Sequence, residues 1–203
     1  MSCKRLEIWD LGIKDGSVEY IPSFFPRQDA DRWLQVLLEC GHWKQSTIKV
    51  FSKTYKIPRL ETWYADTGVH YTYSGTLHHP TDWFQELLEI RMAIQEEFPG
   101  FHFNSALANL YRDGNDSVGW HSDDEPELGK DPVIASVSLG EARKFRLRHK
   151  DYKENGLKEG ILLEHGSLLL MKGTTQHYWK HEVPKAPRIE KPRVNLTFRT
   201  ILG

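Results

Sequence analysis

The second half of the chain alternates apolar and polar residues with a period of two, and this pattern restricts the fold more than any other feature. A period of two is typical of strands that are buried on one face. The pattern predicts six short strands: FNSALANLY (103–111), PVIASVSLG (132–140), KFRLRHK (144–150), GILLEHG (160–166), SLLLMKG (167–173) and RVNLTFRTIL (193–202). Asn155 and Gly156 form a hairpin signal between the third strand and the fourth.

Two segments that precede these strands have a helical period instead. In DADRWLQVLLEC (29–40) one face carries Ala30, Trp33, Leu34, Leu37 and Leu38, and Gly41 ends the helix. In PTDWFQELLEIRMAIQEEFPG (80–100) the stripe is Trp83, Leu87, Ile90, Ile94 and Phe98, with Thr81 as the predicted N-cap. Two helices followed by many strands predict a mainly β chain of the α+β class, a helix-backed β-sandwich or open barrel.

The segment between the two predicted helices differs from both patterns. Residues 44–80 are rich in Thr, Tyr, Ser and Gly and poor in long apolar runs. Such a composition favours extended hairpins on the surface, where binding functions often lie.

Composition limits the kind of protein this can be. The chain has 203 residues, of which 39% are hydrophobic and 27% charged, so we expect one globular domain, residues 1–203, and a monomer. It has no apolar run of the ~20 residues that span a bilayer, and its first residues, MSCKRLEIWD, lack a signal-peptide pattern. Cys3 and Cys40 are isolated, which argues against a cysteine-based zinc site. We expect a cytoplasmic protein, nuclear as well in a eukaryote.

The net charge of −1 conceals an asymmetry along the chain. Residues 143–203 carry 14 Lys or Arg against 6 Asp or Glu, whereas residues 1–142 carry 13 against 22. A basic half can provide a surface that binds a polyanion, and it can equally consist of scattered, solvated charges. Charge alone does not decide between the two.

The stretch WHSDDEPELG (120–129) concentrates metal-ligating side chains. It lacks the glycine and the oxygen spacing of a calcium loop, and the chain has no H-E-x-x-H motif. His121 and Asp123 are two residues apart, so on an extended backbone both side chains face one ion. With a distant histidine they would form the two-histidine, one-carboxylate set of non-haem iron oxygenases, although a short H-x-D match also occurs by chance in surface loops.

Three later histidines could complete that set: His165, His177 and His181. His181 is preferred because it lies in an extended segment ending at Val183-Pro184, 12 residues before Arg193. His177 is the alternative.

The strand RVNLTFR (193–199) places polar groups on one face. Alternation puts Val194, Leu196 and Phe198 on one side, and Arg193, Asn195, Thr197 and Arg199 on the other. Two arginines on an inward face require an anion, and together they could bind a small dicarboxylate. A salt-bridged outer face explains the same pattern. The strand FNSALANLY offers Asn109 and Tyr111 on a face shared with Leu107.

Taken together, these segments resemble the AlkB family of Fe(II)/2-oxoglutarate-dependent nucleic-acid demethylases. The resemblance rests on NLYRDG, WHSDDEPELG, PVIASVSLG, HGSLLLM, WKHEVP and PRVNLTFR, which occur in the family's order over about residues 20–201. It is strongest to the alkylation-repair homologues, as RLETWYADTGVHYTYSG indicates. It implies a double-stranded β-helix, or jelly roll, at about residues 103–201, with a nucleotide-recognition lid at about residues 44–80.

The resemblance also implies roles for individual residues. His121, Asp123 and His181 would bind Fe(II), and Asn109, Tyr111, Arg193, Asn195, Thr197 and Arg199 would hold 2-oxoglutarate. Substrate would be contacted by Phe51, Ser52, Lys53, Tyr71, Thr72, Tyr73 and Asp124. Tyr73 would stack on the extracted base, Asp124 would bind its exocyclic amine, and Phe51 would be either a wedge in the duplex or a hairpin tip packed on the core. Glu125 would be structural.

The resemblance suggests that the basic half of the chain binds the phosphates of a nucleic acid. Lys144, Arg146 and Arg148 share one face of a predicted strand and could bind phosphates, as could Arg143 and the segment KAPRIEK (185–191). The implied activity is oxidative demethylation of 1-methyladenine and 3-methylcytosine in alkylated DNA, with Fe(II), 2-oxoglutarate and O₂ and with release of formaldehyde. The alternatives are an oxygenase that acts on RNA, protein or a small molecule, and a nucleic-acid-binding module without catalysis.

Overall fold

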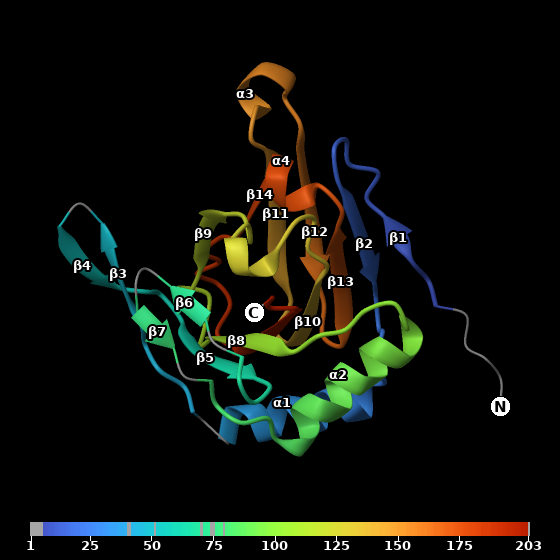
Figure 1. Cartoon of the computed structure of the whole chain (residues 1–203), viewed down its shortest axis with the longest axis vertical. Coiled ribbons are helices and arrows are strands. Elements are labelled where there is room, and N and C mark those ends of the chain that lie inside the picture. Colours follow the sequence, from blue (N-terminus) through green and yellow to red (C-terminus); the bar gives the residue numbers. More distant parts are fainter. Residues whose placement is uncertain are drawn as a thin grey trace.

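Two antiparallel sheets form the framework of the molecule (Figure 1). The computed structural model describes residues 6–39, 42–50, 52–69, 71–73, 76–78 and 80–202, with the backbone alone at 49–50, 71–73 and 76–78. The large sheet has the order β1-β2-β13-β10-β15-β8-β5, and the small sheet has the order β12-β11-β14-β9.

The large sheet consists of β1 (Trp9–Asp10), β2 (Ser17–Ile21), β13 (Ser167–Lys172), β10 (Ile134–Gly140), β15 (Arg193–Arg199), β8 (Ser105–Tyr111) and β5 (Leu60–Ala65). The small sheet consists of β12 (Lys158–Leu163), β11 (Arg143–His149), β14 (Trp179–Val183) and β9 (Val118–His121). Two further hairpins are β3 (Thr47–Val50) with β4 (Lys53–Lys56), and β6 (Tyr71–Tyr73) with β7 (Thr76–His78). The helices are α1 (Arg27–Glu39), α2 (Gln85–Glu97), α3 (Tyr152–Asn155) and α4 (Thr175–Tyr178).

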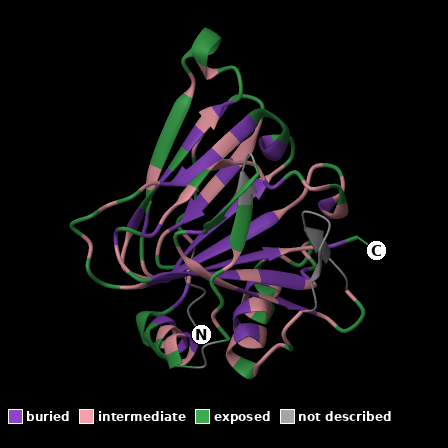
Figure 2. Ribbon diagram, turned by 90° about the vertical axis from the view of Figure 1, so that its left-hand side faces the viewer, coloured by how far each residue is buried: buried purple, intermediate pink, exposed green. Residues whose placement is uncertain are grey.

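The two faces of the large sheet are buried by different partners. On one face, Val194, Leu196 and Phe198 of β15 belong to a core shared with α1 and α2. On the other face, Tyr111 and Met171 belong to a second core that includes Phe145 and Trp179 of the small sheet. Figure 2 shows the buried residues as purple bands along the strands, flanked by half-buried helices. This is the jelly-roll arrangement with helices against one sheet that the sequence predicts.

The large sheet contains three strands, β1, β2 and β5, that the sequence analysis does not predict as part of it. β1 and β2 were not among the predicted strands, and β2 pairs with β13. β5 lies within the range expected for the lid, yet it pairs with β8 along its whole length, and Thr62, Tyr64 and Ala65 are buried. Only the β3–β4 and β6–β7 hairpins lie outside both sheets in the described part of residues 44–80, and β3–β4 extends away from the body of the molecule (Figure 1).

The start of α2 is a correction to the sequence prediction. The helix begins at Gln85, its N-cap is Phe84, and no side chain caps it. Thr81 instead forms an isolated bridge with Tyr64 of β5. The reason is aromatic packing: Trp83 stacks on Phe198 with ring centroids 6.3 Å apart, and this holds residues 81–84 extended against the core.

The β11–β12 hairpin is confirmed. Its strands pair antiparallel, and Gly156 has φ 73°, a left-handed conformation that suits glycine. The connection is longer than a two-residue turn because α3 occupies it. Among the residues that the structure describes, no helix has the length and apolar character needed to cross a membrane.

Candidate metal and co-substrate site

Three predicted metal ligands converge between the two sheets. His121 ends β9 and lies directly opposite His181 of β14 in the strand pairing, and Asp123 follows two residues after His121. Asp123 Oδ1 lies 3.7 Å from His121 Nε2 and 4.0 Å from His181 Nε2. One ligand atom from each residue lies within 4.8 Å of the other two, so one ion can be held by all three. Two imidazoles and one carboxylate form a donor set that suits Fe(II).

Neighbouring groups orient these ligands. His121 Nδ1 lies 2.8 Å from the carbonyl oxygen of Gly119, which leaves Nε2 directed at the other ligands. Arg199 Nη2 donates to Asp123 Oδ2 at 2.8 Å, so the other carboxylate oxygen faces the histidines. His121 and Asp123 are therefore oriented before any ion arrives.

Burial and charge set the protonation of two ligands. Burial on its own would raise the pKa of the Asp123 carboxyl, but the charge of Arg199 and the two neighbouring histidines outweigh it and hold that pKa well below its ordinary value. Burial, together with nearby His121, lowers the pKa of His181 to about 3. Near neutral pH the pair is thus a carboxylate and a neutral imidazole, the forms that bind metals.

The other two candidate histidines lie elsewhere. His165 Nδ1 accepts a hydrogen bond from the Gly140 amide, and its Nε2 lies 3.1 Å from Asp31 of α1. His177 Nε2 lies 3.1 Å from Asp131. Neither joins the metal cluster, and the preference for His181 as third ligand agrees with the geometry.

The polar face of β15 lines the cavity that contains the three ligands. This cavity has a volume of about 950 Å³. Its wall includes every side chain expected to hold a dicarboxylate: Asn109, Tyr111, Arg193, Asn195, Thr197 and Arg199. Strand register explains the grouping, because Arg193 lies opposite Tyr111 and Asn195 opposite Asn109. The alternative of a salt-bridged outer face is thereby excluded.

Arg193 fits a carboxylate ligand. It is 1% exposed, and its Nη2 donates to Ser138 Oγ at 2.9 Å. Its Nε and Nη1 are buried and have no hydrogen-bond acceptor among the residues that the structure describes. Burial lowers the pKa of Arg193 to about 10, so the side chain remains charged at neutral pH. A carboxylate, such as one end of 2-oxoglutarate, would supply both the charge and the acceptors that this group lacks.

The remaining cavity groups are joined by hydrogen bonds that the sequence indicates only in part. Asn195 Nδ2 donates to Ser136 Oγ at 2.8 Å, and Arg59 Nε donates to Asn109 Oδ1 at 2.7 Å. The role of Ser136 and Ser138 could have been inferred, since IASVSLG alternates in the same way as RVNLTFR. No local pattern identifies Arg59, whose position depends on the pairing of β5 with β8.

The predicted substrate residues are less completely placed. Phe51 lies outside the described residues, and for Tyr71, Thr72 and Tyr73 only the backbone of β6 is described. Ser52 and Lys53 are exposed at the tip of the β3–β4 hairpin, and neither lines the cavity. Asp124 does not line it either: its Oδ2 accepts from Lys150 Nζ at 3.3 Å. Glu125, the residue expected to be structural, does line the cavity.

The basic face predicted on β11 exists, with one correction. Lys144, Arg146 and Arg148 alternate with the buried Phe145 and Leu147. Arg143, however, is 1% exposed and cannot contact a phosphate. Its guanidinium donates to backbone carbonyl oxygens of Asp113, Asp116 and Pro184, and so joins two loops inside the protein.

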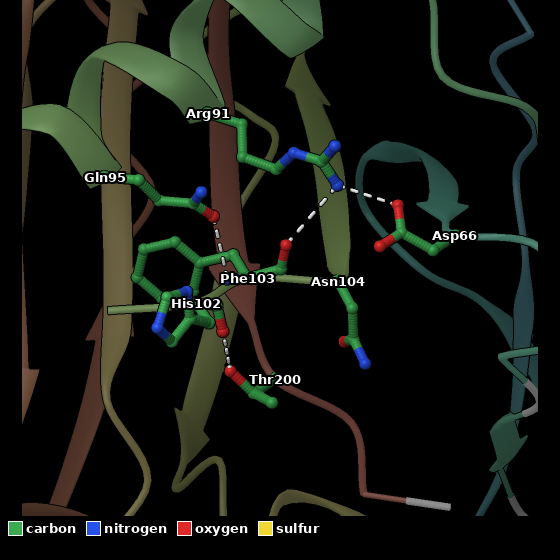
Figure 3. Close-up of a pocket in the computed structure, with 7 residues that line it drawn as sticks. All are labelled: Asp66, Arg91, Gln95, His102, Phe103, Asn104 and Thr200. Carbon is green, nitrogen blue, oxygen red and sulfur yellow. Dashed lines mark hydrogen bonds and ion pairs between the residues drawn. The ribbon is translucent and has the colours of Figure 1, made fainter. Parts of the chain in front are cut away.

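A second, shallower hollow of about 350 Å³ shares no lining residue with the cavity (Figure 3). Its polar groups bond to one another. Arg91 Nη1 donates to Asp66 Oδ1 at 2.7 Å, Gln95 Oε1 accepts from the Phe103 amide, and Thr200 bonds the carbonyl of His102. The contacts of Arg91 and Gln95 connect α2 to the segments next to β5 and β8, and we assign the hollow no function.

Comparison with known proteins agrees with this geometry. Residues 17–199 match the family described as the 2OG-Fe(II) oxygenase superfamily. "Alpha-ketoglutarate-dependent dioxygenase alkB homolog 3" of Homo sapiens is 45% identical over 206 residues, which cover 97% of this chain and 71% of that protein. The protein of the same name from Bos taurus is 44% identical, with 89% and 64% covered.

Two further comparisons extend the result. "DNA oxidative demethylase ALKBH2" of Mus musculus is 42% identical over 160 residues, which cover 76% of this chain and 66% of that protein. A solved structure described as "The structure of OsALKBH1" superposes with a TM-score of 0.62 at 17% identity, covers 97% of this chain and 100% of that chain, and supports the fold. The chain therefore belongs to the 2OG-Fe(II) oxygenase superfamily and, within it, to the alkB homologues.

Proposed function

We propose that the protein is an Fe(II)- and 2-oxoglutarate-dependent dioxygenase that removes methyl groups from N-alkylated bases of DNA, with 1-methyladenine and 3-methylcytosine as substrates. One observation carries the proposal most directly. The ligands His121, Asp123 and His181 share a cavity with a buried arginine, Arg193, that has two unsatisfied donors. The names of the relatives, which include dioxygenases and DNA oxidative demethylases, support the reaction and the substrate class.

The chain's own residues would prepare the reaction. With Fe(II) held by the three ligands, O₂ and 2-oxoglutarate would supply the oxidising power that converts the methyl group to a hydroxymethyl group, while 2-oxoglutarate becomes succinate and CO₂. Arg193 would bind the distal carboxylate of 2-oxoglutarate, with Tyr111 and Asn195 beside it, and Arg199 would stabilise the carboxylate end nearer the metal ligands. The hydroxymethyl product then loses formaldehyde and leaves the unmodified base.

The proposed substrates suit an enzyme that must extract a base. A methyl group on N1 of adenine or N3 of cytosine lies on the Watson–Crick edge and weakens pairing, which lowers the cost of extrusion. The cavity wall also includes Thr47, Ile48 and Thr54 of the β3–β4 hairpin, so the hairpin borders the path to the metal ligands. We propose that Tyr73 stacks on the extracted base and that Asp124 binds the exocyclic amine of that base. For Phe51 we propose a role as a wedge in the duplex, with a packed hairpin tip as the alternative.

The small sheet supports nucleic acid as the substrate class. Arg148 of β11 lies directly between Lys158 of β12 and Lys180 of β14 in the strand register. Like charges directly opposite one another destabilise a sheet unless an anion compensates them. None of these three cations forms an ion pair with a carboxylate in the described part of the chain. Arg148 is held against Trp120, its guanidinium carbon 4.1 Å from the ring centroid, and Trp120 lines the cavity. A nucleic-acid strand whose phosphates contact Lys158, Arg148 and Lys180 would run toward the cavity that contains the metal ligands.

The test is to measure formaldehyde and succinate with oligonucleotides that contain 1-methyladenine or 3-methylcytosine, as single-stranded DNA, duplex DNA and RNA. We expect stoichiometric release of both products with methylated DNA, and loss of both in His121→Ala. Unmethylated oligonucleotides of the same sequence are the control. If no methylated oligonucleotide raises succinate above the unmethylated background, the substrate class is wrong; if RNA is preferred to DNA, the DNA assignment is wrong.

A further inference from the structure

Asp123 is held differently from the other two metal ligands. His121 and His181 lie in paired strands, whose ladder fixes their backbones. Asp123 lies two residues beyond the end of β9, where that ladder has stopped. Its position must therefore be set by other contacts, and its carboxylate contact with Arg199 does not fix the backbone that carries it.

Two contacts from the segment that contains α4 hold this backbone. Ser122 Oγ donates to the carbonyl oxygen of Trp179 at 2.9 Å. The Asp123 amide donates to the side-chain oxygen, Oε1, of Gln176 at 2.9 Å. Gln176 is 0% exposed, so this is a bond between fully buried groups. Such a bond is costly to lose because an unpaired buried amide keeps its full desolvation penalty.

The surroundings of Gln176 fix the direction of its amide. Since the Asp123 N–H needs an acceptor, the oxygen must face Asp123, and the NH₂ group then faces Met171 Sδ at 3.5 Å. The preceding residue, Thr175, bonds both the amide and the carbonyl of Ser17 in β2, which anchors α4 to the large sheet. Gln176 thus connects the ligand loop to the fixed framework (α4 and β2 in Figure 1).

We infer that Gln176 is a positioning residue for the metal ligand Asp123, an inference that rests on the metal site of the proposed function. Without the Gln176 oxygen, the Asp123 amide would turn toward another acceptor, and its carboxylate would move with it. The structure assigns this role to the side-chain oxygen and not to the volume that the side chain fills. Groups that support a ligand from outside the coordination sphere typically contribute 10- to 100-fold in metal affinity.

The experiment is a Co(II) titration followed by the visible d–d absorbance, which reports both affinity and coordination geometry. Gln176→Leu keeps the volume and removes the acceptor, and we expect Co(II) to bind about 10-fold or more weakly with an altered spectrum. Gln176→Glu keeps a side-chain oxygen that can accept from the Asp123 amide, and we expect Co(II) affinity within about 3-fold of wild type. Ser167→Ala removes a buried hydrogen bond to the Glu164 carbonyl and is the control, with unchanged affinity.

Three results would overturn the inference. They are wild-type affinity and spectrum in Gln176→Leu, equal losses in Gln176→Leu and Gln176→Glu, and absence of Co(II) binding by the wild type. Should Gln176→Leu fail to fold, hydrogen exchange of the wild-type Asp123 amide decides: protection supports the bond, and exchange at the rate of an open loop rejects it. Wild-type protein that binds Co(II) but releases no formaldehyde would reject demethylation while leaving the role of Gln176 standing.

Discussion

At the scale of single residues, Arg193 carries a positive charge where water scarcely reaches it. Its side chain is 1% exposed, and its guanidinium carbon lies 5.1 Å from the Tyr111 ring centroid. Arg143 lies near the same ring, at 5.4 Å, and adds a second cation. Two buried cations beside one ring are unfavourable without an anion. The local free energy therefore favours a bound dicarboxylate over the empty pocket.

Replacing Arg193 with an uncharged residue should weaken the binding of 2-oxoglutarate without lowering the stability of the protein. In Arg193→Met we expect the dissociation constant for 2-oxoglutarate to rise about 30-fold or more, since losing one partner of a buried charge pair costs about 2 kcal/mol or more. Thermal unfolding without ligand should stay at the wild-type temperature or rise, because a buried unpaired charge is removed. Thermal shift during a 2-oxoglutarate titration measures both. Arg148→Met is the control, and equal stabilisation by 2-oxoglutarate in wild type and Arg193→Met would contradict the role.

At the scale of elements, α1 and α2 are joined by polar contacts in which Glu89 is the main acceptor. Glu89 of α2 accepts from Arg32 at 2.6 Å and from the Trp33 indole at 3.0 Å, both on α1. These hydrogen bonds, Arg32 first, lower the pKa of Glu89 to about 2. The carboxylate is thus stabilised in the folded protein relative to the unfolded chain. Its contribution is complete above the ordinary pKa of a glutamate and is lost as the pH falls toward 2.

This linkage predicts a specific loss of stability in acid. Between about pH 4.5 and pH 2, the free energy of unfolding of the wild type should fall more steeply than that of Glu89→Gln, which has no proton to take up at this position. Urea unfolding at several pH values measures both slopes. Glu96→Gln, an exposed position on the same helix, should retain the wild-type slope. Parallel curves for wild type and Glu89→Gln would show that the bonds do not shift this pKa.

The sequence could reveal features that depend on a single strand, but not features that depend on contacts between distant segments. The alternation in RVNLTFR identified the cavity face of β15, and the His-x-Asp spacing identified two ligands, because both depend on side-chain direction along one strand. The start of α2 and the burial of Arg143 could not be read locally, since they depend on Phe198 and on loops distant in sequence. Arg59 and Gln176 were missed for the same reason: each acts on a residue at least 50 positions away.

At the scale of the whole molecule, charge is distributed unequally between the two sheets. The row of Lys158, Arg148 and Lys180 crosses the small sheet, while α1 and α2, which carry several glutamates, cover the far face of the large sheet. A polyanion is therefore attracted to the small-sheet side of the cavity and repelled from the helix side. This arrangement would orient a nucleic acid before any base is recognised.

The orientation predicts a salt dependence. Each phosphate contact with single-stranded nucleic acid adds about 0.7 to the negative slope of log affinity against log salt concentration. We expect Arg148→Met to reduce the slope by about that amount, and Arg148→Met with Lys180→Met by about twice as much. Fluorescence anisotropy with a labelled single strand over a range of salt concentrations measures it. Arg27→Met, on α1, is the control and should leave the slope unchanged. An unchanged slope in the double variant would show that Arg148 and Lys180 do not contact phosphates.

The two-sided burial of β15 also limits how this gene can change in length. Inserting or deleting one residue within Arg193–Arg199 would exchange the faces, so that arginines would enter the helix-side core and Phe198 would enter the cavity. The same event would abolish folding and co-substrate binding together. Insertions within α3, in the β11–β12 connection, would cost neither, because no residue of this helix is buried. Variation in length among functional variants of this chain should therefore concentrate at that connection and be absent from the last strand.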